Sequence, residues 1–96
     1  MIKEFQTYLE KIVEMTCGFK PTVKVLEIAP GTLQAFLEGT QDEQALMMGR
    51  EGKTITALTR FALIFGKRHQ FFPYIYVRRK SETDDAFGET LKEILK

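Results

Sequence analysis

The stretch Met48-Gly49-Arg50-Glu51-Gly52-Lys53 decides the fold that this sequence predicts. Two glycines three residues apart frame a tight turn that carries cations, and the residues on both sides have helical character. A glycine-x-x-glycine pattern alone occurs by chance in roughly two of every five chains of this length, at about 7% glycine. The neighbouring segments therefore decide what the turn means.

A helix is predicted on each side of the turn. The first spans residues 40–48, with Thr40 or Asp42 as its cap and acids in its first turn, where the helix dipole favours them. The second begins at residue 53 or 54 and runs to about residue 65. Gly66, which two cations follow, is interpreted as its stop signal. The inner stripe of this second helix comprises Ile55, Leu58, Ala62 and Phe65.

Upstream of these helices the sequence predicts a β-hairpin. Residues 23–29 are rich in β-branched side chains, and residues 32–38 alternate between apolar and polar side chains. Pro30-Gly31 between them places proline and glycine where a type II turn requires them. One face of the second strand is expected to be apolar, with Leu33, Ala35 and Leu37.

The remaining elements complete the order α-β-β-α-α-β-α. The chain opens with an amphipathic helix of about 14 residues, after which Gly18 is a candidate C-cap. A short β run at residues 74–77 follows the two central helices, so it joins the hairpin by a crossover. A last helix within residues 81–96 has four apolar side chains on one side, namely Phe87, Leu91, Ile94 and Leu95.

The predicted fold class is therefore α+β, with a three-stranded mixed sheet and the helices packed on one face. This order resembles the type II K-homology (KH) fold over nearly the full chain, with residues 1–80 as the KH-like domain and residues 81–96 as a helical extension. In particular, the segment around the turn is similar to that of small bacterial KH proteins of the KhpA-like kind and of the KH module of Jag-type proteins. The matching residues are Leu46-Met47-Met48-Gly49-Arg50-Glu51-Gly52-Lys53-Thr54-Ile55-Thr56-Ala57-Leu58.

The resemblance implies non-catalytic binding of about four nucleotides of single-stranded RNA in a groove beside the turn. The family suggests an RNA chaperone or post-transcriptional regulator, and no cofactor. The expected RNA-binding residues are Met48, Gly49, Arg50, Glu51, Gly52, Lys53, Thr56 and Arg60. Candidates for the apolar floor on which bases would lie are Met47, Met48, Ile55 and the ring of Phe36.

The charge distribution agrees with this expectation better than the net charge does. The formal net charge is only +1, but residues 49–80 contain eight Lys and Arg against one acid. The flanking parts, residues 1–48 and 81–96, each carry a net charge of −3. On a helical wheel Lys53, Thr56, Arg60 and Lys67 fall within about 60° of one another, at about 100° per residue. This places a basic stripe beside the turn.

Several other functions are excluded by the residues present. Gly52-Lys53-Thr54 matches the end of a P-loop, but the first glycine of that motif would fall on Met47. A single cysteine, Cys17, and a single histidine, His69, are too few for a zinc site, and His69 is interpreted as a surface residue rather than a catalytic one. The lone cysteine and the absence of a long apolar run indicate a cytoplasmic protein that does not enter a membrane.

Two questions about partners stay open at this stage. A second copy of the chain or a second KH protein could pair with it, through the Phe71-Phe72 pair or the apolar side of the last helix. The alternative function is a protein-interaction or ribosome-assembly adaptor with a KH-like fold and little RNA affinity of its own. Glu51 favours that alternative, because an acid in the turn repels phosphate.

Overall fold

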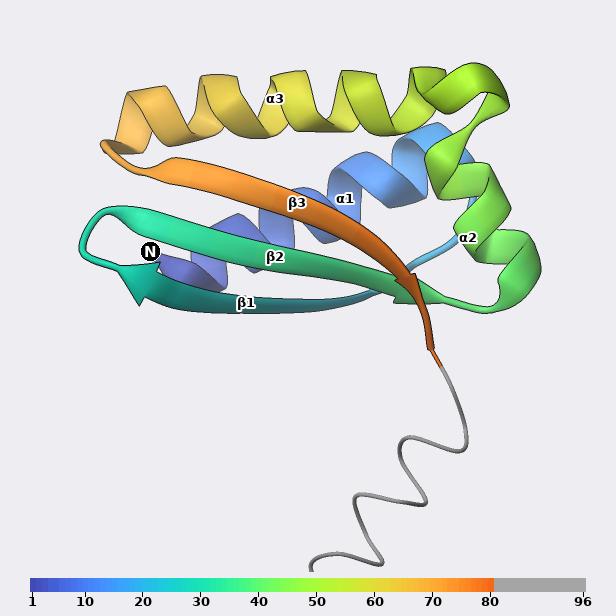
Figure 1. Ribbon diagram of the computed structural model, residues 1–96, viewed down its shortest axis with the longest axis horizontal. Helices are drawn as coiled ribbons and strands as arrows, with labels where there is room; N and C mark the ends of the chain where they lie inside the picture. The colour runs from blue at the N-terminus through green and yellow to red at the C-terminus, as the bar shows by residue number, and fades with distance from the viewer. Residues whose placement is uncertain (81–96) are drawn as a thin grey trace, which may run out of the picture.

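Helices and strands follow in the order α-β-β-α-α-β across residues 1–80, the part of the chain that the computed structural model describes (Figure 1). The elements are α1 (Ile2–Cys17), β1 (Thr22–Ala29), β2 (Thr32–Gly39), α2 (Gln41–Met48), α3 (Lys53–His69) and β3 (Phe72–Arg79). The order differs in detail from the predicted one, because a single 3-10 turn, η1 (Arg50–Gly52), separates α2 from α3. The predicted last helix lies outside the described residues.

The three strands form one mixed sheet in the order β1-β2-β3. The β1–β2 hairpin is antiparallel, and Gly31 at its turn has a φ of 74°, as a type II turn requires. β3 lies parallel to β2 and reaches it by the crossover through α2 and α3. The predicted α+β class with a three-stranded mixed sheet is confirmed, and residues 1–80 contain three of the predicted helices.

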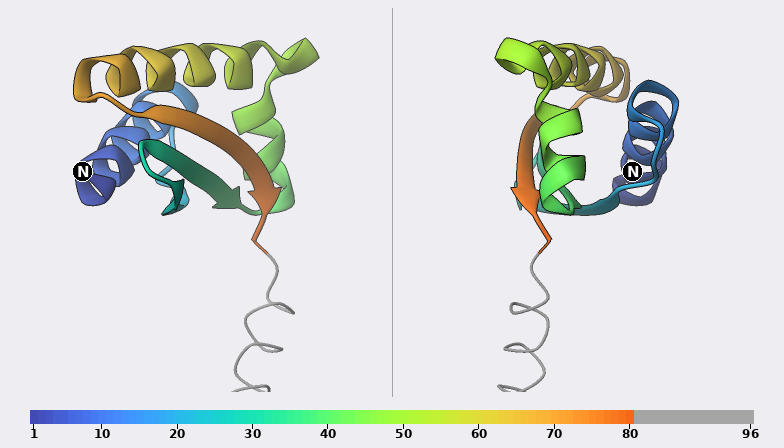
Figure 2. Two further views of the ribbon diagram at one scale, coloured as in Figure 1. Left: turned by 60° about the vertical axis from the view of Figure 1, so that its left-hand side comes forward. Right: turned by 90° about the vertical axis from the view of Figure 1, so that its right-hand side faces the viewer.

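The core lies between one face of this sheet and the helices. Leu33, Ala35 and Leu37 point into it from the central strand, as their alternation predicts. The helices contribute five buried apolar side chains from α1 and α3 and one from α2: Phe5, Leu9, Val13, Leu58, Ala62 and Met47. Figure 2 shows the helices on the same side of the curved sheet, and no other element within residues 1–80 covers the opposite face.

The prediction that α3 ends before Gly66 is wrong. The helix continues to His69 and ends at Gln70, which adopts the left-handed conformation with a φ of 65°. Gly66 is buried, and a Cβ added there would lie 2.5 Å from the carbonyl oxygen of Phe71 and 3.0 Å from Pro73. The glycine is therefore needed for the close return of the chain into β3, and it does not stop the helix.

Within residues 1–80, no helix combines the length and the apolar composition that crossing a bilayer requires.

Candidate functional site

The turn between α2 and α3 is built from backbone conformations that L-residues adopt rarely. α2 is closed by the N–H of Gly49, which donates to the Ala45 carbonyl at 2.9 Å. Gly49 then takes a φ of 75° and a ψ of 168°, outside the helical region, so the helix cannot continue. Glu51 and Gly52 also have positive φ, at 58° and 72°. Three of the four residues in the turn therefore have positive φ, which reverses the chain within a few residues. Arg50 and Glu51 are exposed at its tip.

The sequence sets the entry and exit of this turn by local rules. Thr40 caps α2: its hydroxyl accepts a hydrogen bond from the Glu43 N–H, and the Glu43 carboxylate accepts one from the Thr40 N–H. At the other end, α3 starts after Gly52 with no side-chain cap and no acid in its first turn. The first N–H groups of α3 therefore have no side-chain acceptor among the described residues, and the helix dipole places a partial positive charge there.

The two glycines of the turn have different surroundings. A Cβ at Gly49 would lie 2.2 Å from the Thr54 hydroxyl oxygen and 2.7 Å from the Thr54 backbone nitrogen. A Cβ at Gly52 would meet only one atom within 4 Å, the Ile55 Cγ2 at 3.8 Å. Thr54 therefore occupies the space beside Gly49. The space beside Gly52 stays open at the surface, where another molecule can approach the main chain.

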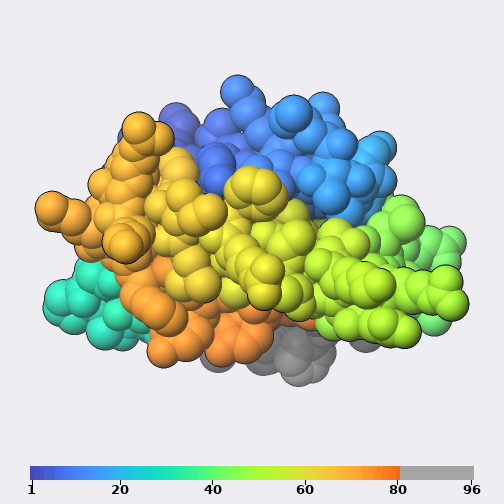
Figure 3. All heavy atoms as spheres, turned by 90° about the horizontal axis from the view of Figure 1, so that it is seen from above, coloured from blue at the N-terminus to red at the C-terminus, as the bar shows by residue number. Residues whose placement is uncertain are grey.

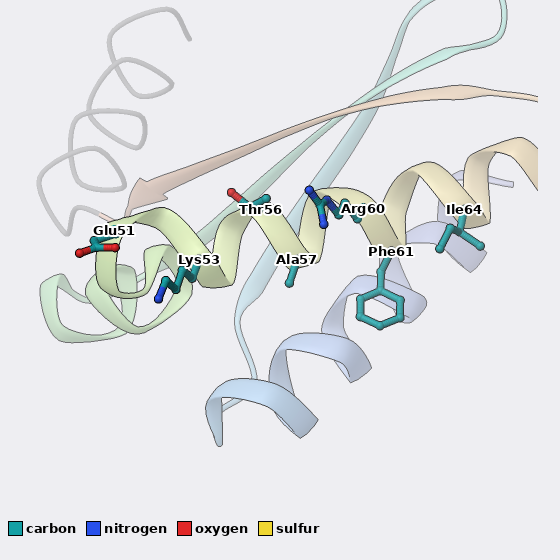
Figure 4. A pocket seen from close by; sticks show the side chains of 7 residues that line it. All are labelled: Glu51, Lys53, Thr56, Ala57, Arg60, Phe61 and Ile64. Atoms are coloured by element: carbon teal, nitrogen blue, oxygen red, sulfur yellow. The ribbon is translucent and has the colours of Figure 1, made fainter.

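A shallow groove of about 440 Å³ begins at this turn and follows the outer face of α3. It is lined by Glu51, Lys53, Thr56, Ala57, Arg60, Phe61 and Ile64. Figure 4 shows Thr56 and Arg60 on one side of the helix and Ala57 and Phe61 on the other. In Figure 3 α3 runs across the middle of the molecular surface, between α1 and β3. The groove is an open surface rather than an enclosed pocket.

The groove is basic and apolar at once. α3 contains four Lys and Arg residues and no acid. Within residues 1–80, neither Lys53 nor Arg60 forms an ion pair. Phe61 and Ile64 are 51% and 64% exposed, whereas Leu58 and Ala62 on the inner side of the same helix are buried. Such a surface suits a long anion that carries flat apolar groups. It also suits a protein surface that combines acidic and apolar side chains.

The structure brings together four of the residues predicted from the sequence, since Glu51, Lys53, Thr56 and Arg60 all line this groove. The other four form the turn itself or the residue before it: Met48, Gly49, Arg50 and Gly52. Sequence reasoning missed Ala57, Phe61 and Ile64. Their signal was a second apolar stripe at i, i+4 and i+7, offset from the inner stripe of the same helix.

Two of the predicted base-stacking candidates are placed elsewhere. Met47 is fully buried in the core, so it cannot contact a base at the surface. Phe36 lies on the face of the sheet opposite the helices, where Tyr76 stacks on it with ring centroids 5.6 Å apart. Met48 is 40% exposed beside the turn and Ile55 is partly buried, so Met48 is the accessible one of the two.

The Phe71-Phe72 pair, predicted as one contact surface, is divided between the two faces of the sheet. Phe71 packs against Phe5 in the core, with ring centroids 4.9 Å apart. Phe72 points to the open face and contacts Tyr74, with centroids 5.1 Å apart. The two adjacent aromatic rings therefore cannot serve a common surface.

The titratable groups that show a clear environmental effect are not themselves among the side chains that line the groove. Burial raises the pKa of the Cys17 thiol at the end of α1, where its Sγ lies 3.7 Å from the Leu46 carbonyl oxygen. Burial also raises the pKa of Tyr8, whose hydroxyl donates to the Phe61 carbonyl at 3.3 Å and ties α1 to α3. His69, the last residue of α3, packs on Phe65 and lies in a different element from Cys17.

No family model and no curated protein matches this chain.

Proposed function

We propose that residues 1–80 form a type II KH-like domain that binds single-stranded RNA without catalysis. The arrangement β2-α2-turn-α3-β3, with the two strands parallel and neighbouring, supports this reading of the fold. The glycine turn lies at the surface between the two helices, which is where such a domain places its contact with the sugar-phosphate backbone.

One observation carries the proposal: the open space at Gly52 lies between Glu51 and Lys53, which both line the basic groove on α3. A phosphate can approach the main chain at Gly52 because no side chain of the protein fills that space. There it meets the N-terminal N–H groups of α3 and the cations of Arg50 and Lys53. The path continues to Arg60, about 10 Å further along the helix at about 1.5 Å per residue.

The apolar members of the groove offer a surface to bases. Unstacked bases of single-stranded RNA stack on aromatic and apolar side chains, typically with about 1–3 kcal/mol per base. Phe61 and Ile64 are exposed along the groove and replace Met47 and Phe36 as the candidates for this contact. Glu51 lines the same groove near the turn, and its charge opposes phosphate there.

The proposal is tested by fluorescence anisotropy of short labelled single-stranded RNAs at two salt concentrations. The double change Arg50→Asp, Glu51→Asp alters two exposed side chains, and Asp tolerates the left-handed conformation at position 51. A matched control is Arg68→Asp, which makes the same change in charge about 22 Å away along α3, at about 1.5 Å per residue.

We expect the wild-type affinity to fall with salt by about 0.7 logarithmic units per unit of log salt for each phosphate neutralised. The double change should remove most of the binding, and Arg68→Asp should retain it, with both variants folded by circular dichroism. Equal binding by wild type and the double variant would remove the turn from the mechanism.

The exposed apolar side chains of the groove also favour the second candidate, an adaptor that binds a protein rather than RNA. The two functions differ in their salt dependence, because a contact dominated by Phe61 and Ile64 does not release counterions. If the folded protein binds no RNA at low salt, the adaptor function replaces RNA binding as the proposal.

A further inference from the structure

The face of the sheet opposite the helices is unusually apolar for a surface. Five large apolar or aromatic side chains on it, from β1 and β3, are 44% to 52% exposed: Leu26, Ile28, Phe72, Tyr74 and Tyr76. Phe36 stacks on Tyr76 and Phe72 contacts Tyr74, whereas Leu26 on β1 lies across Gln34 from Tyr74. We call this surface, including Phe36, the open sheet face. Several large apolar side chains exposed on one face favour an interaction surface there.

The polar end of the same face lies where the chain leaves the sheet. Glu38 is buried there between Arg78, which donates to it, and Lys24, whose Nζ lies 3.3 Å from the other carboxylate oxygen. Lys80 follows on the same face: its N–H donates to the Gly39 carbonyl, and its Nζ lies 3.4 Å from the Thr22 hydroxyl on β1. The exit end of the open sheet face thus carries three cations against one acid.

The sequence of residues 81–96 complements the open sheet face: acids come first and apolar residues follow. This is the order needed if the chain turns back over the face after Lys80. The first five of these residues contain three acids, Glu82, Asp84 and Asp85. The apolar residues Phe87, Leu91, Ile94 and Leu95 follow, and on a helical wheel they fall within about 100° of one another. A segment that turns back at Lys80 would place its acids over the cations at the exit end and its apolar side chains over Tyr74, Phe72 and Leu26.

The dimensions agree as well. Sixteen residues in a helix span about 24 Å, and each eight-residue strand of the sheet spans about 26 Å. We propose that residues 81–96 dock as an amphipathic helix across the open sheet face of the same molecule, so that the sheet is covered on both sides. The proposal is independent of RNA binding, because the groove on α3 lies on the other side of the sheet.

The test uses the full chain with Phe87→Trp, because the sequence contains no tryptophan and the new indole is the only one. Docking should shift its emission to shorter wavelength and weaken acrylamide quenching several-fold relative to the urea-unfolded protein, independently of protein concentration. In this background Tyr74→Asp, on the open sheet face, should restore the exposed emission. The matched control Phe61→Asp changes a similarly exposed aromatic residue on α3 and should leave the emission unchanged.

Leu91→Asp in the same background perturbs the segment without touching residues 1–80, so it should also expose the indole while circular dichroism and the melting temperature report the fold. An exposed indole in the folded Phe87→Trp protein would overturn the proposal. The proposal would also be overturned if Phe61→Asp shifted the indole emission and Tyr74→Asp did not. Concentration-dependent burial, with a doubled mass by light scattering, would show that a second copy covers the face instead. An exposed indole with RNA binding that Tyr74→Asp weakens would assign the face to RNA.

Discussion

The two glycines of the turn should differ strongly in what they contribute to stability, although the sequence motif treats them alike. We compare Gly49→Ala with Gly52→Ala. At Gly49, the backbone lies at a φ of 75° and a ψ of 168°, a region populated essentially by glycine alone. Holding an L-residue there costs of the order of 1–3 kcal/mol.

The new methyl group at position 49 also collides with α3. It would lie 2.2 Å from the Thr54 hydroxyl oxygen and 2.7 Å from the Thr54 backbone nitrogen, so the first turn of the helix must shift. Overpacking of this kind costs about 1–3 kcal/mol. The two costs together give a loss of about 4 kcal/mol in the free energy of unfolding, a large part of the 5–15 kcal/mol that is typical of a domain.

At Gly52 only the backbone term remains, because the space beside it is open. A φ of 72° and a ψ of 16° lie in the left-handed region, which costs an L-residue about 1–2 kcal/mol. We therefore expect Gly52→Ala to lose about 1 kcal/mol, which leaves a difference of about 3 kcal/mol between the two variants.

Urea unfolding followed by circular dichroism measures both losses, with the m-value checked for constancy. If Gly49→Ala is too unstable to fold, the double change Gly49→Ala, Thr54→Ala provides the second measurement. It removes the hydroxyl contact but keeps the contacts of the Thr54 Cβ and backbone nitrogen, each at 2.7 Å, so it should recover only part of the loss. Equal losses at the two glycines, or a larger loss at Gly52, would refute the reasoning.

Three further predictions follow from the described contacts. Arg78→Ala should cost about 2 kcal/mol in urea unfolding because it removes a partner of the buried Glu38 carboxylate, and an unchanged midpoint would contradict this. Thr40→Ala should cost about 1 kcal/mol by removing the cap of α2, whereas Thr40→Ser should be nearly neutral; equal losses in these two variants would rule out the capping hydrogen bond. Cys17 should be alkylated more slowly in the folded protein than in urea at neutral pH, because burial raises its pKa and reduces its thiolate fraction. The rate in the folded protein should rise as pH passes the raised pKa, and equal rates in both states would count against this effect.

Local patterns in the sequence were sufficient where neighbouring residues alone set the outcome. The alternation of Leu33, Ala35 and Leu37 predicts a buried strand face, and all three are buried. The Pro30-Gly31 turn and the Thr40 cap were also predictable, because each depends on the backbone preferences of two to four adjacent residues.

The errors arose where distant segments meet. Gly66 has the local character of a helix stop, but it lies inside α3 because the chain returns past it at Phe71. Phe36 and Met47 were both candidates for the apolar floor of the groove. The fold buries Met47 in the core and places Phe36 on the face of the sheet opposite α2 and α3. Phe61 and Ile64 follow the same helical spacing as core residues, and only the packing of α1 and β3 around α3 leaves them exposed.

The sequence by itself therefore determined the succession of helices and strands within residues 1–80, the inward face of β2 and the position of the glycine turn, since periodicity and turn chemistry are local properties of the chain. The tertiary structure alone decided which surfaces remained open. Exposure of Phe61 on α3 and of Tyr74 on the sheet depends on which elements pack against those faces, and that packing is fixed by the parallel crossover between β2 and β3. It also distinguished Gly49 from Gly52, because only the position of Thr54 in the folded chain fills the space beside the first glycine.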